Sequence, residues 1–204
     1  MAALAQDLLA LALTVLLSLV QAAYGAPAGA LAADLADGWH SWEVPAGTSG
    51  RRACCHNVHG GKVGTTGCRL GGGSGGVTID SDCEPASDLL RVYVFVADGD
   101  VAEIRALSAG CPVEAASPVR DLGRPPVADS IAWLDRHAVA GSGLADDAVV
   151  AIALHDDAAA FAALKGMVED PRRGMDVREQ ALFWLAHSDN DEAFRYLDRL
   201  LSSR

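Results

Sequence analysis

The sequence predicts an α+β protein, in which a small disulfide-stapled antiparallel β module precedes a short solenoid of about two helix pairs. Two observations favour this class. The five cysteines and most glycines lie before residue 112, among short runs with β-type alternation. After the boundary at Arg124-Pro125-Pro126, apolar residues recur at helical spacing and cysteine is absent. We therefore divide the chain into a Cys-rich β module at 38–124 and a helical part at 125–204.

Composition and charge exclude several classes of protein. Half of the 204 residues are hydrophobic and 21% are charged, which excludes disorder over most of the length. The net charge of −11 indicates a surface that repels phosphate groups, so we expect no nucleic-acid partner. Anionic membrane surfaces are disfavoured for the same reason. We expect membrane contact only if the N-terminal segment stays uncleaved.

The N-terminal segment is predicted to be an export signal. Residues 8–20 are apolar and uncharged, a length that suits a signal peptide of roughly 7–15 apolar residues and falls short of a spanning helix. Small residues suitable for cleavage follow at Ala22 and Ala30, so the signal is residues 1–22, or extends as late as residue 30. An uncleaved anchor and a buried helix are the alternatives, because residues 1–7 contain no Lys or Arg. The predicted location is periplasmic or secreted.

The cysteines are predicted to form disulfides, because an exported chain meets an oxidising compartment. They are Cys54, Cys55, Cys68, Cys83 and Cys111. Since five is odd, at least one thiol is unpaired or bridges two chains. The simplest pairing joins Cys54 or Cys55 to Cys68, and Cys83 to Cys111. The alternatives are buried free thiols and a metal or thiol centre, although the CxxC spacing typical of metal sites is missing. Its ligands would be Cys54, Cys55, His56, His59 and Cys68.

The β module is predicted to contain a sheet of about four to five antiparallel strands. Short strands are expected at Trp39–Val44, Arg52–Val58 and Val77–Ile79. Two longer β-rich runs in Leu89–Ser108 flank Asp98-Gly99, which predicts a type I′ hairpin. Alternation on the first run places two sets of side chains on opposite faces. One set is Leu90, Val92, Val94 and Val96, and the other is Leu89, Arg91, Tyr93 and Phe95.

Five helices joined by short connections are predicted in the last third of the chain. Their expected ranges are Val127–Ala140, Leu144–His155, Ala158–Glu169, Asp176–His187 and Asn190–Ser203. Gly141 and Pro171 end the first and third helices, and Ser188 is the expected cap of the last. The first helix is expected to bridge the two parts by packing Ile131 and Leu134 into both.

An internal repeat with an offset of 33 residues relates these helices. The offset aligns Ala148 with Ala181, Ile152 with Leu185, Phe161 with Phe194 and Leu164 with Leu197. Repeats of this length with two helices each are typical of solenoids.

Val177–Ala186 (VREQALFWLA), an acidic joint and Glu192–Leu197 (EAFRYL) resemble bacterial HEAT-like repeats. Residues 38–204 resemble exported bacterial HEAT-repeat domain-containing proteins of unknown function, in which a Cys-rich β module with a Cys-Cys pair precedes the helices. Ser108–Val113 fits that layout. The resemblance implies a protein-binding or scaffolding module of the cell envelope, and it carries over no catalytic residue.

Motifs that would indicate catalysis are sparse. Gly71–Gly76 matches two glycine-rich motifs, but no helix follows it, so we interpret it as a loop. His137 and His155 are interpreted as solvated helix-end histidines. The pairs Asp146-Asp147 and Asp156-Asp157 are expected at helix starts, where carboxylates favour the helix dipole. We predict no catalytic residue, metal or cofactor, and no enzyme. The alternative is an enzyme or metal-binding protein that uses the Cys/His cluster.

The C-terminal helices carry more apolar surface than a terminal repeat normally presents. The last helix has a broad apolar stripe, composed of Ala193, Phe194, Leu197, Leu200 and Leu201. We predict that Phe183, Phe194 and Leu201 dock a protein partner or a second copy of the chain. The alternative is that all three are ordinary core residues.

Overall fold

The structure of the protein is a computed structural model that describes residues 31, 34–55, 57–59, 62–64, 68–71, 77–79 and 87–202. The predicted signal peptide, residues 1–22, lies outside the described residues, as does Cys83. In the part of the chain that is described, no helix combines the length and the apolarity that crossing a bilayer requires. Four strands and five helices carry the fold, so the predicted α+β class is confirmed.

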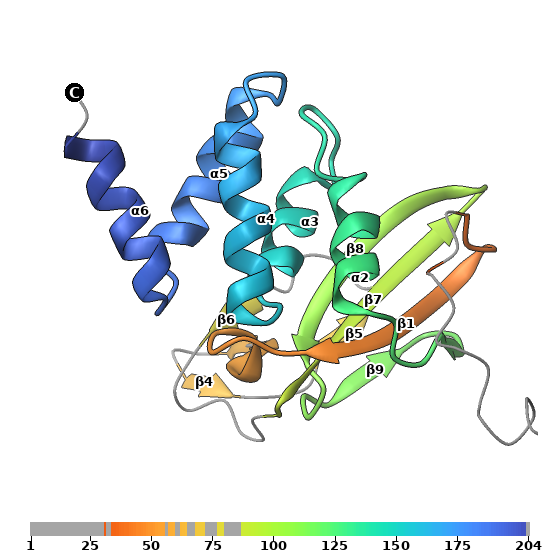
Figure 1. The fold of residues 1–204 in the computed structure, drawn as a ribbon. Coiled ribbons are helices and arrows are strands. Elements are labelled where there is room, and N and C mark those ends of the chain that lie inside the picture. Colours follow the sequence, from red (N-terminus) through yellow and green to blue (C-terminus); the bar gives the residue numbers. More distant parts are fainter. Residues whose placement is uncertain are drawn as a thin grey trace, which may run out of the picture. The chain divides into compact units, whose positions relative to one another are not determined.

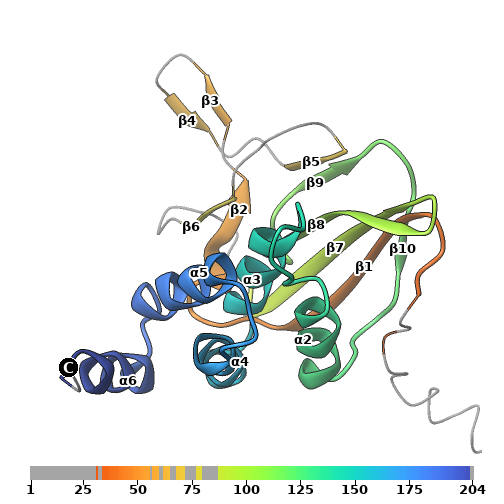
Figure 2. The ribbon, with the colours of Figure 1, turned by 90° about the horizontal axis from the view of Figure 1, so that it is seen from above.

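The central sheet has four strands in the order β10-β1-β7-β8. Figure 1 labels β1, β7 and β8, and Figure 2 also labels β10. Their bounds are β1 Gly38–Pro45, β7 Leu89–Ala97, β8 Asp100–Ser108 and β10 Val119–Asp121. β7 runs antiparallel to both of its neighbours, β1 and β8. β10 pairs with the free edge of β1 in the parallel direction, so the expectation of a purely antiparallel sheet is wrong at this edge. After β8, at the opposite edge of the sheet, the chain returns to the edge of β1 and forms β10 in the same direction as β1.

Three small two-stranded sheets lie outside the central sheet (Figure 2). They pair β2 Ala53–Cys55 with β6 Val77–Ile79, β3 Asn57–His59 with β4 Lys62–Gly64, and β5 Cys68–Leu70 with β9 Val113–Ala115. The expectation of one strand at Arg52–Val58 is wrong. Gly50–Arg52 forms a 3-10 turn, η1, and the rest divides between β2 and β3, which take different partners.

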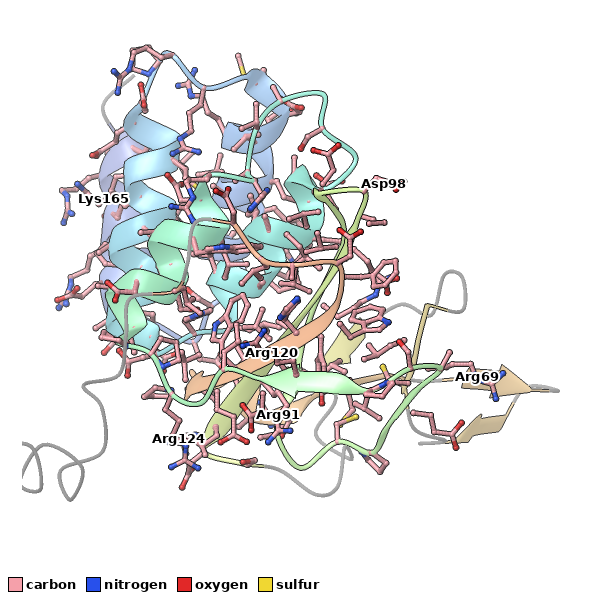
Figure 3. All side chains as sticks on the ribbon, turned by 90° about the vertical axis from the view of Figure 1, so that its right-hand side faces the viewer. Arg69, Arg91, Asp98, Arg120, Arg124 and Lys165 are labelled. Atoms are coloured by element: carbon pink, nitrogen blue, oxygen red, sulfur yellow. The ribbon has the colours of Figure 1, made fainter. Side chains whose placement is uncertain are left out.

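The two faces of β7 are as the alternation predicts. Leu90, Val92, Val94 and Val96 belong to the larger hydrophobic core, whereas Tyr93 and Phe95 pack in a smaller one. Arg91 shares the second face, and Figure 3 shows it near Arg124 at one end of the sheet. Asp98 and Gly99 have φ values of 55° and 82°, which confirms the type I′ turn between β7 and β8.

All five predicted helices are present. They are α2 Val127–Asp135, α3 Ala145–Ala153, α4 Asp157–Glu169, α5 Met175–Ala186 and α6 Asp191–Ser202. α2 ends at Asp135 instead of Ala140, and tight turns follow it. In these turns the carbonyl of Ala138 accepts a hydrogen bond from Arg173 at 3.2 Å.

The acidic pairs lie at helix starts, as predicted, but the cap of α6 is not the predicted residue. Asp146 and Asp147 lie in the first turn of α3, and Asp156 accepts hydrogen bonds from two backbone amides at the start of α4. Asn190, and not Ser188, caps α6, because its Oδ1 accepts from the amide of Glu192 at 2.8 Å. The hydroxyl of Ser188 donates to a carbonyl of α5 instead.

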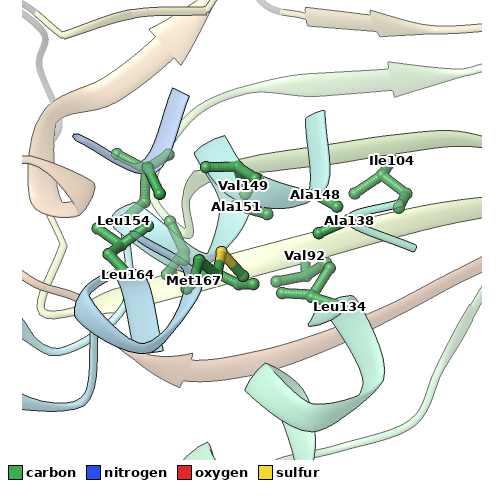
Figure 4. Packing of buried hydrophobic residues seen from close by; sticks show 14 of the residues in the cluster. Val92, Ile104, Leu134, Ala138, Ala148, Val149, Ala151, Leu154, Leu164 and Met167 are labelled. Atoms are coloured by element: carbon green, nitrogen blue, oxygen red, sulfur yellow. The ribbon is translucent and has the colours of Figure 1, made fainter. Parts of the chain in front are cut away.

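One hydrophobic core joins the sheet to the helices (Figure 4). Val92 and Ile104 of the sheet lie in the same buried cluster as Leu134 of α2, Val149 of α3 and Leu164 of α4. The indoles of Trp42 on β1 and Trp133 on α2 meet edge to face at 5.3 Å between ring centroids. α2 therefore bridges the two parts through its buried side, as predicted.

Candidate functional site

A buried hydrogen-bonded chain connects β1, α2 and the end of α3. The indole N–H of Trp42 donates to the Ser130 hydroxyl at 2.7 Å. Ser130 Oγ lies 2.8 Å from His155 Nε2, and His155 Nδ1 lies 2.7 Å from the carbonyl of Ala151. Because that carbonyl can only accept, Nδ1 carries the proton and Nε2 accepts from Ser130. Burial lowers the pKa of His155 to about 4, so the ring is neutral.

The interpretation of His155 as a solvated helix-end histidine is wrong. The segment after β1 covers it, since the Gly47 amide donates to the Leu154 carbonyl at 3.1 Å and the Asp156 amide donates to the Pro45 carbonyl at 3.1 Å. His137 differs, because it is half-buried and its ring lies 4.3 Å from the Trp133 ring. Burial also lowers the pKa of His137.

A serine that donates to a histidine is the arrangement of an activated nucleophile, but this pair has no access to a substrate. Ser130 and His155 are both 0% exposed, and the indole of Trp42 also contacts the serine hydroxyl through its hydrogen bond. The pair therefore satisfies buried polar groups that join three elements. Sequence reasoning missed Ser130, because no local pattern connects it to a histidine 25 residues away.

Three of the five cysteines gather in the smaller core. Cys54, Cys68 and Cys111 lie there with Trp39, Tyr93 and Leu107. Cys111 is a free thiol directed at the carbonyl of Pro112, so the expected bridge from Cys83 to Cys111 is wrong. No two cysteines of the described residues stand at disulfide distance.

The alternative metal or thiol centre falls mostly outside the described residues. His56 and the side chains of Cys55 and His59 lie outside them, so the cluster and the bridge from Cys55 to Cys68 stay predictions. The alternative bridge from Cys54 to Cys68 is wrong, because these two residues do not stand at disulfide distance. Among the side chains that are described, no group of three His, Cys, Asp or Glu residues could hold a metal ion.

The three predicted docking residues are exposed. Phe183 is 48% exposed, Phe194 73% and Leu201 71%, so none of them is an ordinary core residue. Leu200 on α6 and Met175 at the start of α5 add to the apolar surface of these two helices. Most other large apolar side chains of the described chain are buried, and Val139, between α2 and α3, is an exception. The last two helices thus carry most of the exposed large apolar side chains.

α6 uses one side for packing and leaves an apolar stripe on another. Ala193 and Tyr196 are its buried residues. At 100° per residue, Phe194, Leu197 and Leu201 fall within an arc of about 60°, which we call the α6 stripe. Two of its three members are largely exposed and Leu197 is partly covered.

The counterparts of the α6 stripe on α4 are covered. At the 33-residue spacing they are Phe161, Leu164 and Val168. Leu164 and Val168 are buried, and the Phe161 ring is met edge-on by Tyr196 of α6 at 6.4 Å between centroids. α6 thus covers part of this face of α4, whereas Phe194 and Leu201 on the same face of α6 are largely exposed.

Phe183 is exposed yet held in place. Its ring stacks on that of His187 with 4.0 Å between centroids, and the Trp184 ring meets it edge-on at 5.6 Å. His187 is itself fixed, since its Nδ1 donates to the carbonyl of Phe183 at 2.8 Å. A ring whose position is already fixed loses little conformational entropy when a partner covers it.

A shallow groove of about 680 Å³ lies between α2 and α4. Small residues line much of it, including Ala132, Ala162 and Gly166, and the ion pair of Asp135 with Arg173 (2.6 Å) lies at its border. Because Asp135 and Arg173 neutralise each other, this border of the groove presents no unpaired charge to a ligand.

Comparison of the chain with protein-family models, curated proteins and solved structures found no match.

Proposed function

We propose that this chain is an exported HEAT-like repeat protein whose last two helices dock a protein partner or a second copy, as a binding or scaffolding module of the cell envelope. The observation that carries this proposal is the exposure of Phe183, Phe194 and Leu201 on α5 and α6. Exposed large apolar side chains concentrate on these two helices, and exposed apolar patches usually mark sites of protein association.

The 33-residue repeat supports the HEAT-like part of the proposal. α3 and α5 occupy equivalent places in it, as do α4 and α6. Buried positions correspond, because Ala148, Ala160 and Ile152 match Ala181, Ala193 and Leu185, and all six are buried. In stacked repeats each unit contacts its neighbours, so the face of α6 that no described helix covers is the face on which a partner would pack.

The disulfide part of the proposal is reduced to one bridge, from Cys55 to Cys68, because Cys54 and Cys68 do not stand at disulfide distance. The position of Cys68 in one small core with Cys54, the chain neighbour of Cys55, supports it. Peptide mapping of non-reduced mature protein tests it, and a map with every thiol alkylated without prior reduction would refute it.

The docking proposal is tested with Phe194→Asp and Leu201→Asp. Val139→Asp is the matched control, since Val139 is 55% exposed and lies away from α6. Self-association is measured by sedimentation, and partner capture by cross-linking in periplasmic extract. We expect both α6 variants to melt like the wild type and to lose association at least about tenfold, with Val139→Asp unchanged.

Two results would overturn the docking proposal. One is loss of the cooperative melt in both α6 variants, which would assign them to the core. The other is unchanged association and capture in both variants. Leu164→Asp on α4 supplies the reference for a core substitution, because Leu164 is the buried counterpart of Leu197.

A further inference from the structure

The contact between α4 and α6 indicates what kind of side chain would fit the α6 stripe. On α4, Phe161 and Lys165 together hold Tyr196: the two aromatic rings meet edge to face, and Lys165 Nζ lies 5.7 Å from the centre of the tyrosine ring. An aromatic ring and a cation one helical turn apart thus receive a ring from the next unit.

The same two positions on α6 carry a different charge. At the 33-residue spacing, Phe161 corresponds to Phe194 and Lys165 to Asp198. Phe194 and Asp198 are four residues apart, so they are neighbours on one side of the helix. The aromatic ring is kept, but the cation is replaced by an anion, which inverts the charge that an incoming side chain would meet.

We propose that the partner docks an amphipathic helix on the α6 stripe and places a lysine or arginine against Phe194 and Asp198; this inference rests on the proposed docking function. The ring face attracts a cation and the carboxylate pairs with it, so both groups favour the same side chain. Arginine suits the site better, because its planar guanidinium can stack on the ring and hydrogen-bond the carboxylate together.

The charges around the stripe agree with a basic partner. Asp198 is exposed, and no ion pair occupies it within the described residues. Asp191 lies three residues before Phe194 on the same margin. Residues 175–202 contain six carboxylates and three arginines. A second copy of the chain would bring the same acidic margin against itself, in a protein with a net charge of −11, so we commit to a different, basic partner.

The test uses two model helices that share one leucine stripe at i, i+3, i+4 and i+7. One carries arginines and the other carries glutamates beside the stripe, and binding to the full chain is followed by fluorescence anisotropy. We expect the arginine helix to bind at least about tenfold more tightly at low ionic strength, and the ratio to shrink as salt is added. Asp198→Lys should reverse the preference. Glu192→Lys, the same charge change at another exposed position of α6, should preserve the order of the two helices.

The outcomes separate this inference from the proposed function. Equal binding of both helices that Phe194→Asp abolishes would overturn the charged partner and leave docking intact. Binding of neither helix, with self-association that Leu201→Asp abolishes, would also overturn the inference alone and favour a second copy. Binding that neither Phe194→Asp nor Leu201→Asp alters would overturn both.

Discussion

The hydroxyl of Ser130 on α2 donates to Nε2 of His155, 2.8 Å away, where α3 gives way to α4. Since Trp42 donates to the same hydroxyl and Ala151 accepts from the other ring nitrogen, the chain of hydrogen bonds has one direction. That direction requires a neutral imidazole. A proton on Nε2 would place two donors against each other in a fully buried site.

We predict that the stability of the folded chain depends on pH through His155. Its pKa is about 4 in the folded protein and near 6.5 in the unfolded chain. Between these values the unfolded chain binds a proton that the folded chain does not, so the free energy of unfolding falls as the pH drops from about 6.5 to 4 and is fully retained above that window. The shift corresponds to roughly 3 kcal/mol.

The measurement is urea unfolding at a series of pH values for the wild type and His155→Gln. Carboxylates titrate in both proteins, so the difference between the two curves isolates the histidine. We expect the wild type to lose stability more steeply than the variant between pH 6.5 and 5. Parallel curves would show that His155 is as easily protonated in the folded protein as in the unfolded chain.

We predict opposite effects of alanine at two glycines. A Cβ at Gly50 would lie 2.0 Å from the backbone oxygen of Leu154, so the loop after β1 must move away from the end of α3. A Cβ at Gly166, inside α4, meets nothing within 4 Å. Gly50→Ala should lower the free energy of unfolding by about 1–3 kcal/mol, and Gly166→Ala should raise it by about 0.5–1 kcal/mol. Thermal melts of the two variants decide this, and a neutral Gly50→Ala would refute the close packing.

Short-range signals in the sequence predicted much of the fold. The alternation of β7 fixed its two faces because side-chain direction follows the backbone period. The Asp98-Gly99 turn and the five helices have equally local signals. The parallel pairing of β10 with β1 has no such local signal, because it joins residues about 80 positions apart in the sequence.

The candidate site was predictable for a related reason. Helical periodicity predicted that Phe194 and Leu201 lie on one apolar stripe of the last helix, and both side chains are largely exposed in the structure. The Ser130–His155 pair was missed because it depends on how the loop after β1 covers the end of α3. Such coverage is a property of tertiary packing, which composition and period do not contain.

We predict that Glu43 stabilises the far face of the sheet through two arginines. Arg91 donates to one of its oxygens and Arg124 lies 2.9 Å from the other, at the end of the sheet seen in Figure 3. The hydrogen bond from Arg91 is the main cause of the lowered pKa of Glu43. Its stabilising effect is therefore present above the ordinary glutamate pKa and is lost as the pH falls through the lowered value.

Glu43→Gln should destabilise the protein by about 1–3 kcal/mol, because it leaves the partly buried Arg91 without its anion. Glu169→Gln is the control, since Glu169 pairs with Lys165 in a solvent-exposed i,i+4 contact worth at most about 0.5 kcal/mol. Denaturant midpoints of both variants at neutral pH test the difference. Equal losses would mean that the Glu43 pair behaves as a surface pair.

The last prediction concerns the dependence of the helices on the sheet. Residues 126–204 without the sheet would expose the inner faces of α2 and α3, including Trp133, Leu134 and Ala148, which are buried with Trp42 and Val92 in one core. Two helix pairs also fall below the roughly three units that an independent solenoid needs. We expect this fragment to show helical circular dichroism without a cooperative melt.

A chain shortened to end at residue 187 removes α6, whose only buried side chains are Ala193 and Tyr196, and should keep a cooperative melt at a lower temperature. A sharp melt of fragment 126–204 would show instead that the helices form a core of their own.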